Sequence, residues 1–275
     1  MKSVLRRFKS AVDLWSDHQA PRLGAAVAFY AIFSITPLVL MVVMVAGMFV
    51  DAGFARREFL DQLEELLGSG AASSVETMID AAAKASDKGP WAGITSAVAL
   101  FVGASGVFVE LRYALDAIHG TTRGRDSFVS WFVRGRLWSL ALVLAVGFLL
   151  LVSLIASAVI SAMGGWLTAM FPVLGLLAIA LNLLLSLAIL SALFGMLMRW
   201  LPSQREAWRR VWGGAVLAAV LLEVGKELLG LYLGRAAFAD AYGAAGGLVV
   251  LVMWIYFAVQ VFLFGAAFNE VGKSQ

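Results

Sequence analysis

Long apolar runs separated by short polar stretches dominate the chain, and this pattern predicts helices that cross a membrane. An α-helix rises ~1.5 Å per residue, so a hydrocarbon core about 30 Å thick is spanned by roughly 20 apolar residues. Runs of at least this length are expected to give about six spans. Their predicted bounds are 23–50, 91–113, 137–162, 172–198, 211–233 and 248–268. We therefore predict an all-α, polytopic integral membrane protein with a single membrane domain over residues 1–275.

Two segments outside these runs are predicted to form amphipathic helices. In residues 1–22, Val4, Phe8, Val12 and Trp15 recur at helical spacing among basic side chains, which is typical of a helix lying in the membrane interface. Residues 51–91 form the longest polar segment, and a Gly-Ser-Gly sequence at 68–70 divides it. The apolar spacing on either side predicts a helical hairpin on the outer side, between the first two spans. We interpret this hairpin as a solvated cap without a ligand.

Composition and the distribution of charge support a membrane protein and predict its orientation. The chain is 61% hydrophobic and 14% charged, against about 45–50% and about 25% in soluble domains. Lys and Arg are concentrated before residue 23, between 112 and 136, and between 199 and 210, so these segments should face the cytoplasm. Both termini of the multi-pass protein are therefore predicted to be cytoplasmic.

This topology also accounts for the basic sequence pI of about 9.3, so a nucleic-acid partner is not needed. The expected partners are membrane lipids, whose anionic head groups would lie at the basic cytoplasmic loops. An oligomer is compatible with the sequence.

The fifth predicted span carries ionisable side chains in its middle, and they are the first candidate for a functional site. On a helix, Glu223, Lys226 and Glu227 are three or four residues apart and share one face. Insertion scales put each at roughly +2.5 to +3.5 kcal/mol at the bilayer centre, so this face is expected to contact protein or water rather than lipid. Two interpretations stay open: a structural ion pair between Glu223 and Lys226, or a polar transport site on the wall of a pathway.

Further polar side chains in or beside the predicted spans are candidates for the lining of such a pathway. They are Tyr30, Ser34, Asn182, Tyr242 and Gln260. For Asn182, an interhelical hydrogen bond is the first interpretation. In the first span, Pro37 lacks an N–H and is predicted to kink the helix.

The chain offers little for catalytic chemistry. It contains no cysteine, which excludes disulfides, thiol chemistry and iron–sulfur clusters. Its two histidines, His18 and His119, are far apart in sequence, which argues against a His-rich hydrolytic metal site. There is no Walker motif, so coupled transport would use an ion gradient or a partner. We therefore predict no metal, no cofactor and no enzymatic activity.

The order and spacing of several short motifs resemble the YihY/virulence factor BrkB family over nearly the whole chain. The motifs are Ala25 to Tyr30 with Ser34 and Pro37, Leu111 to Ile118, Leu201-Pro202, Trp208, Gly213 or Gly214, Glu223, Lys226, Tyr232, Tyr242 to Gly246, Tyr256, Gln260 and Phe264 to Ala266. Two positions depart from the family's pattern. Ala267 stands where relatives usually carry Glu, and Asp116 stands where an Asn is common.

The resemblance implies a bacterial inner-membrane protein. Members were formerly mislabelled ribonuclease BN, and some are linked to the export of envelope lipid or lipopolysaccharide. Together with the candidate site, this favours a transporter or translocator of a lipid or another amphiphilic, anionic envelope substrate. A non-catalytic membrane scaffold with structural intramembrane ion pairs is the alternative, and a ribonuclease is the least favoured interpretation.

Overall fold

The computed structural model describes residues 2–32, 53, 56–57, 60–61, 75–77, 79–80, 106–121, 173–235 and 246–273. All regular secondary structure in these ranges is helical, which confirms the predicted all-helical class for this part of the chain. The longer helices are α1 (Lys2–Asp17), α7 (Val173–Trp200), α8 (Trp208–Arg235) and α10 (Gly246–Val271). Two shorter helices cover Ala20–Ile32 and residues 106–118.

Helices α7, α8 and α10 coincide with the last three predicted spans, and each extends at most about one turn beyond the predicted bounds. Within the described ranges, two stretches are long and apolar enough to cross a membrane, namely Leu183–Trp200 and Leu248–Val271. Helix α8 is of similar length but is interrupted by charged side chains in its second half. Most of the first three predicted spans and of the predicted hairpin at 51–91 lie outside the described residues, so the number of spans stays a prediction.

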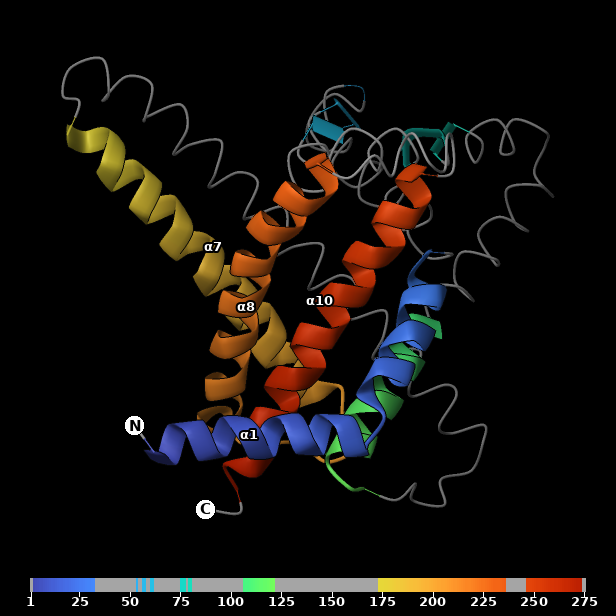
Figure 1. Ribbon diagram of the computed structural model, residues 1–275, viewed down its shortest axis with the longest axis vertical. Helices are drawn as coiled ribbons and strands as arrows, with labels where there is room; N and C mark the ends of the chain where they lie inside the picture. The colour runs from blue at the N-terminus through green and yellow to red at the C-terminus, as the bar shows by residue number, and fades with distance from the viewer. Residues whose placement is uncertain are drawn as a thin grey trace.

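The core forms where α8 packs against both α7 and α10. In Figure 1, α8 and α10 run side by side, and α7 crosses α8 obliquely. Met198 of α7, Leu222 of α8 and Leu263 of α10 are buried in one apolar cluster. Leu23 of helix Ala20–Ile32 and Leu115 of helix 106–118 belong to the same cluster, so the two short helices are part of the bundle.

The crossing of α8 and α10 depends on two glycines that face each other. A Cβ atom on Gly214 would collide with the carbonyl oxygen of Gly265, and a Cβ on Gly265 would press on the carbonyl oxygen of Gly214. Ala215 and Ala218 continue the buried face of α8 with small side chains. Small residues let helix backbones approach closely, and this kind of interface is common between membrane helices.

Helix α1 lies across the end of the bundle formed by the last turn of α10 (Figure 1). Arg7 donates hydrogen bonds from Nη2 and Nε to the carbonyl oxygen of Phe268, at 3.1 and 3.3 Å, where the helix leaves carbonyls without intrahelical partners. Phe8 packs edge-on against Phe264, with 5.0 Å between ring centroids. The helix predicted within residues 1–22 is therefore confirmed as α1. It docks on α10, while Leu5 remains 74% exposed.

Tryptophans gather where α7 ends and α8 begins. Trp208 lies between Trp200 and Trp212, with ring centroids 5.7 and 6.0 Å away, and the guanidinium of Arg199 lies 4.7 Å from the Trp208 ring centroid. Tryptophan and arginine are typical of the boundary between hydrocarbon and water. This end of the bundle, which also carries α1, therefore has the chemistry of a membrane interface.

Candidate functional site

An ion pair lies on the face of α8 for which the sequence predicted a polar site. The Lys226 Nζ atom donates a hydrogen bond to Glu223 Oε1 at 2.8 Å. The pair forms because α8 is one continuous helix of 28 residues, which brings residues three apart onto neighbouring positions. The backbone of Glu227 lies in the same helix, but its side chain is outside the described part of the structure.

Both side chains of the Glu223–Lys226 pair are partly exposed in the described structure. The side chains of Lys226 and Glu223 are 27% and 18% exposed. They lie beside the packed face that contains Leu222, and next to an outward apolar stripe of α8. That stripe consists of Trp212, Val216, Val220, Val224 and Leu228. An ionic group at the border between a packed face and an outward face can meet both protein and a mobile ligand.

Two of the predicted lining residues contact other partners in the described structure. Tyr30 packs its ring against the backbone of Gly106. Gln260 donates from Nε2 to the carbonyl oxygens of Ala20 and Pro21, at 3.3 and 3.5 Å. Within the described ranges neither side chain hydrogen bonds to the ion pair, so a role in a shared pathway stays a prediction.

Other predicted site residues lie outside what the structure describes. They are Ser34, the kink residue Pro37 and Tyr242, together with the side chain of Asn182, whose backbone belongs to α7.

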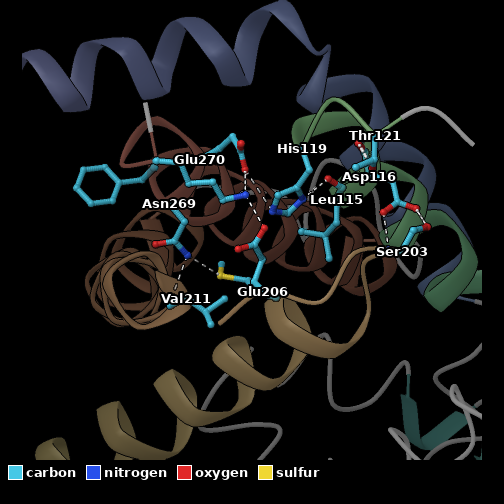
Figure 2. A network of polar contacts seen from close by, with 12 residues as sticks. Leu115, Asp116, His119, Thr121, Ser203, Glu206, Val211, Asn269 and Glu270 are labelled. Carbon is cyan, nitrogen blue, oxygen red and sulfur yellow. Dashed lines mark hydrogen bonds and ion pairs between the residues drawn. The ribbon is translucent and has the colours of Figure 1, made fainter. Parts of the chain in front are cut away.

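A second polar centre, which the sequence did not predict, lies around Asn269 at the α1 end of the bundle (Figure 2). Asn269 is 7% exposed and connects α10, on which it lies, to α7 and α8. Its Oδ1 accepts a hydrogen bond from the Gly214 N–H at 2.6 Å, and its Nδ2 donates to the Val211 carbonyl at 3.0 Å and to Met198 Sδ at 3.5 Å. A buried amide satisfied in this way fixes the position of α10 relative to α7 and α8.

A charged cluster lies beside Asn269 and joins three segments that are distant in sequence. Lys273, just after α10, donates from Nζ to Glu206 Oε1 and to Glu270 Oε2, both at 2.5 Å. His119, at the end of helix 106–118, has its Nε2 atom 3.7 Å from Glu270 Oε2 (Figure 2). We call His119, Glu206, Glu270 and Lys273 the end cluster. It links helix 106–118, the connection between α7 and α8, and the end of α10.

Asp116 forms a further tie to the same connection. Its Oδ1 accepts a hydrogen bond from the Ser203 N–H at 2.7 Å, and its Oδ2 accepts one from Ser203 Oγ at 2.5 Å (Figure 2). Arg112, one turn earlier, donates to Ser203 Oγ at 3.0 Å. Gly120 ends this helix in the left-handed conformation, with φ of 62°, which favours glycine. Asp116, which stands where relatives commonly carry Asn, thus accepts hydrogen bonds from the connection between α7 and α8.

Lys273 is expected to make the folded state sensitive to alkaline pH. Burial lowers the pKa of Lys273, but hydrogen bonds and charge from Glu206 and Glu270 outweigh it and raise that pKa above its ordinary value of 10.5. Stabilisation by a lysine with a raised folded-state pKa is complete below the unfolded-chain pKa and is lost as pH rises through the folded value. The unfolding temperature should therefore fall above about pH 10.4.

A Lys273→Met variant provides the control for this prediction. Its unfolding temperature, measured in the same detergent between neutral pH and the alkaline limit, should fall less steeply than that of the wild type. Parallel curves for the two proteins would show that Lys273 does not carry the alkaline sensitivity.

Two of the described helices are long and apolar enough to cross a membrane, which is compatible with a helical membrane protein. Residues 11–275 match the model of the family described as Virulence factor BrkB, and the chain belongs to this family. The predicted resemblance is thereby confirmed. No solved structure matches the chain significantly.

Similar curated proteins carry the name UPF0761 membrane protein. One from Actinobacillus pleuropneumoniae serotype 5b (strain L20) is 24% identical over 95% of this chain and 94% of its own length. One from Azotobacter vinelandii (strain DJ / ATCC BAA-1303) is 24% identical over 95% of this chain and 63% of its own length. One from Verminephrobacter eiseniae (strain EF01-2) is 36% identical, but the match spans only 30% of this chain and 20% of that protein. These names support a membrane location and assign no biochemical activity.

Proposed function

We propose that the protein moves an anionic lipid or another anionic amphiphile across the bacterial inner membrane, and that the Glu223–Lys226 pair binds the head group. One observation carries this proposal. Two oppositely charged side chains, 2.8 Å apart and partly exposed, lie just past the middle of a helix of 28 residues that is otherwise mostly apolar. Ionisable groups within membrane helices are costly, so they usually mark a pathway for a charged substrate.

The pair suggests how a head group would be held and released. The Lys226 ammonium can bind a phosphate or carboxylate once its hydrogen bond to Glu223 is broken. Glu223 then competes for the same ammonium, which limits the lifetime of the bound state and lets the substrate leave. The outward apolar stripe of α8, from Trp212 to Leu228, is suited to contact with acyl chains.

The proposed placement in the membrane follows the distribution of charge and aromatic residues. Helices α7, α8 and α10 would be three of about six spans, with both termini in the cytoplasm. Helix α1 would lie in the cytoplasmic interface, where its exposed Arg6 and Lys9 would attract anionic head groups while Leu5 enters the acyl boundary.

Reconstitution of the full chain tests this function. Proteoliposomes of phosphatidylethanolamine and phosphatidylglycerol would carry a trace of fluorescent phosphatidylglycerol, and a membrane-impermeant quencher would report its movement between leaflets. We expect movement that increases with the amount of protein and exceeds that in protein-free vesicles. Movement at the protein-free rate, with or without an imposed ion gradient, would contradict the proposal.

A membrane scaffold is the second candidate, because the Glu223–Lys226 pair is already satisfied at 2.8 Å within one helix. A scaffold would use the pair only for stability. The variants described in the Discussion separate the two functions.

A further inference from the structure

Three side chains of the end cluster bring metal-ligating atoms together from separate parts of the fold. They are His119 from the end of helix 106–118, Glu206 from the connection between α7 and α8, and Glu270 from the last turn of α10 (Figure 2). One ligand atom of each lies within 4.8 Å of the others. Among the described residues this is the group of acidic and imidazole side chains whose spacing suits a shared cation.

His119 is oriented as a ligand. Its side chain is 8% exposed, and its Nδ1 lies 2.6 Å from the Leu115 carbonyl oxygen. A carbonyl only accepts, so Nδ1 carries a proton. In the neutral imidazole this leaves Nε2, 3.7 Å from Glu270 Oε2, as the atom that can ligate a metal. No hydrogen bond is made by Nε2 within the described ranges. Metal-ligating histidines nearly always donate their second ring N–H to a carbonyl or carboxylate in this manner.

The ammonium of Lys273 shows that the two glutamates of this cluster can stabilise a positive charge between them. Its Nζ atom lies 2.5 Å from an oxygen of each glutamate, which is close to the position that a bound cation would occupy. Its side chain is 25% exposed and follows the end of α10, so it can turn outward when an ion enters. A recess of about 10 Å³, lined by His119, Glu206, Asn269 and Lys273 among others, adjoins the same atoms and offers room for about one water ligand.

We propose that His119, Glu206 and Glu270 form a binding site for a divalent first-row metal ion such as Zn²⁺, and that this ion replaces the Lys273 ammonium. One imidazole nitrogen and two carboxylate oxygens suit such ions, and two carboxylates balance the charge of a dication. Arg210 also lines the recess, so the surroundings are otherwise positive and entry depends on the departure of Lys273. The bound ion would fasten the end of α10 to helix 106–118 and to the α7–α8 connection. This site is independent of the proposed transport.

Metal titration of the purified full chain in detergent tests the site. Zn²⁺ binding would be measured by calorimetry, and Co²⁺ would report ligand geometry through its absorption bands. We expect about one ion per chain in the wild type, affinity at least about tenfold tighter in Lys273→Met, and affinity at least about tenfold weaker in His119→Gln. Glu206→Gln, on the connection between α7 and α8, carries the same test if His119→Gln does not fold.

His18 supplies a matched control. It also places Nδ1 within hydrogen-bond distance of the carbonyl four residues earlier, at 2.9 Å from Leu14 O, but it has no carboxylates grouped around it in the described structure. His18→Gln should bind Zn²⁺ as the wild type does. Absence of binding in both the wild type and Lys273→Met would overturn the site, and so would equal losses in His18→Gln and His119→Gln.

Discussion

Replacing Lys226 by Met is expected to reduce the movement of fluorescent phosphatidylglycerol in proteoliposomes at least about tenfold, a loss of about 1.4 kcal/mol of transition-state stabilisation. The variant removes the ammonium that would bind the head group, while Met keeps the length of the apolar stem. Glu223→Gln should also slow movement, for a different reason. Without its competing carboxylate, Lys226 would hold the head group longer, so the maximal rate falls and half-saturation comes at a lower lipid fraction.

The scaffold interpretation predicts a change in stability, and none in lipid movement, for these two variants. If the ion pair only locks α8 in place, each single variant leaves one unpaired charge and lowers the unfolding temperature, while any lipid movement per folded molecule is unchanged. The outward-facing Val224→Ala variant is the matched control, because it alters the neighbouring position without touching the charges. Unchanged movement in both Lys226→Met and Glu223→Gln would remove the pair from the transport mechanism.

Gly214→Ala is expected to destabilise the bundle by about 1–3 kcal/mol or more, because the new methyl group would meet the backbone of α10. A Cβ at this position collides with the carbonyl oxygen of Gly265 and presses on the amide of Asn269. Backbone does not move aside as a flexible side chain does, so α8 and α10 would have to separate. Such a separation would also lengthen the 2.6 Å hydrogen bond from the Gly214 N–H to Asn269.

The adjacent glycine provides the control for this prediction. A Cβ on Gly213 would lie 3.6 Å from Asn269 Oδ1, which is an ordinary contact, and Gly213 is exposed. Gly213→Ala should therefore be neutral or stabilise α8 by up to about 1 kcal/mol through helix propensity. Thermal unfolding in detergent measures both variants. Equal unfolding temperatures for the two would show that the close crossing at Gly214 does not hold the bundle together.

Hydropathy predicted the long helices well because the property that defines a span is local. The apolar runs at 172–198, 211–233 and 248–268 became α7, α8 and α10 almost unchanged. The Glu223–Lys226 pair was predictable for the same reason, since two residues three apart on one helix meet whatever surrounds them. The amphipathic helix at the N-terminus followed from spacing alone, but its docking through Arg7 on the Phe268 carbonyl did not.

The polar contacts at the α1 end of the bundle could not be predicted, because they join residues far apart in the sequence. Asp116 and Ser203 are separated by 87 positions and Lys273 and Glu206 by 67. A weak signal was present: Asn269, Glu270 and Lys273 follow directly on the apolar run of the last span, where a span returns to polar surroundings. Which partners they find depends on how the helices pack, and one sequence does not specify that.

If the Glu223–Lys226 pair borders a polar pathway, water should reach position 223, and cysteine accessibility in the reconstituted protein measures this. The natural chain has no cysteine, so each single variant carries one thiol. Thiols react as thiolates, which form in water and not in hydrocarbon. We expect a membrane-impermeant thiol reagent to modify Glu223→Cys rapidly and to leave Val224→Cys, on the outward apolar stripe, unmodified. Equal protection of both positions would contradict the polar pathway, because the charged pair would then be sealed from water.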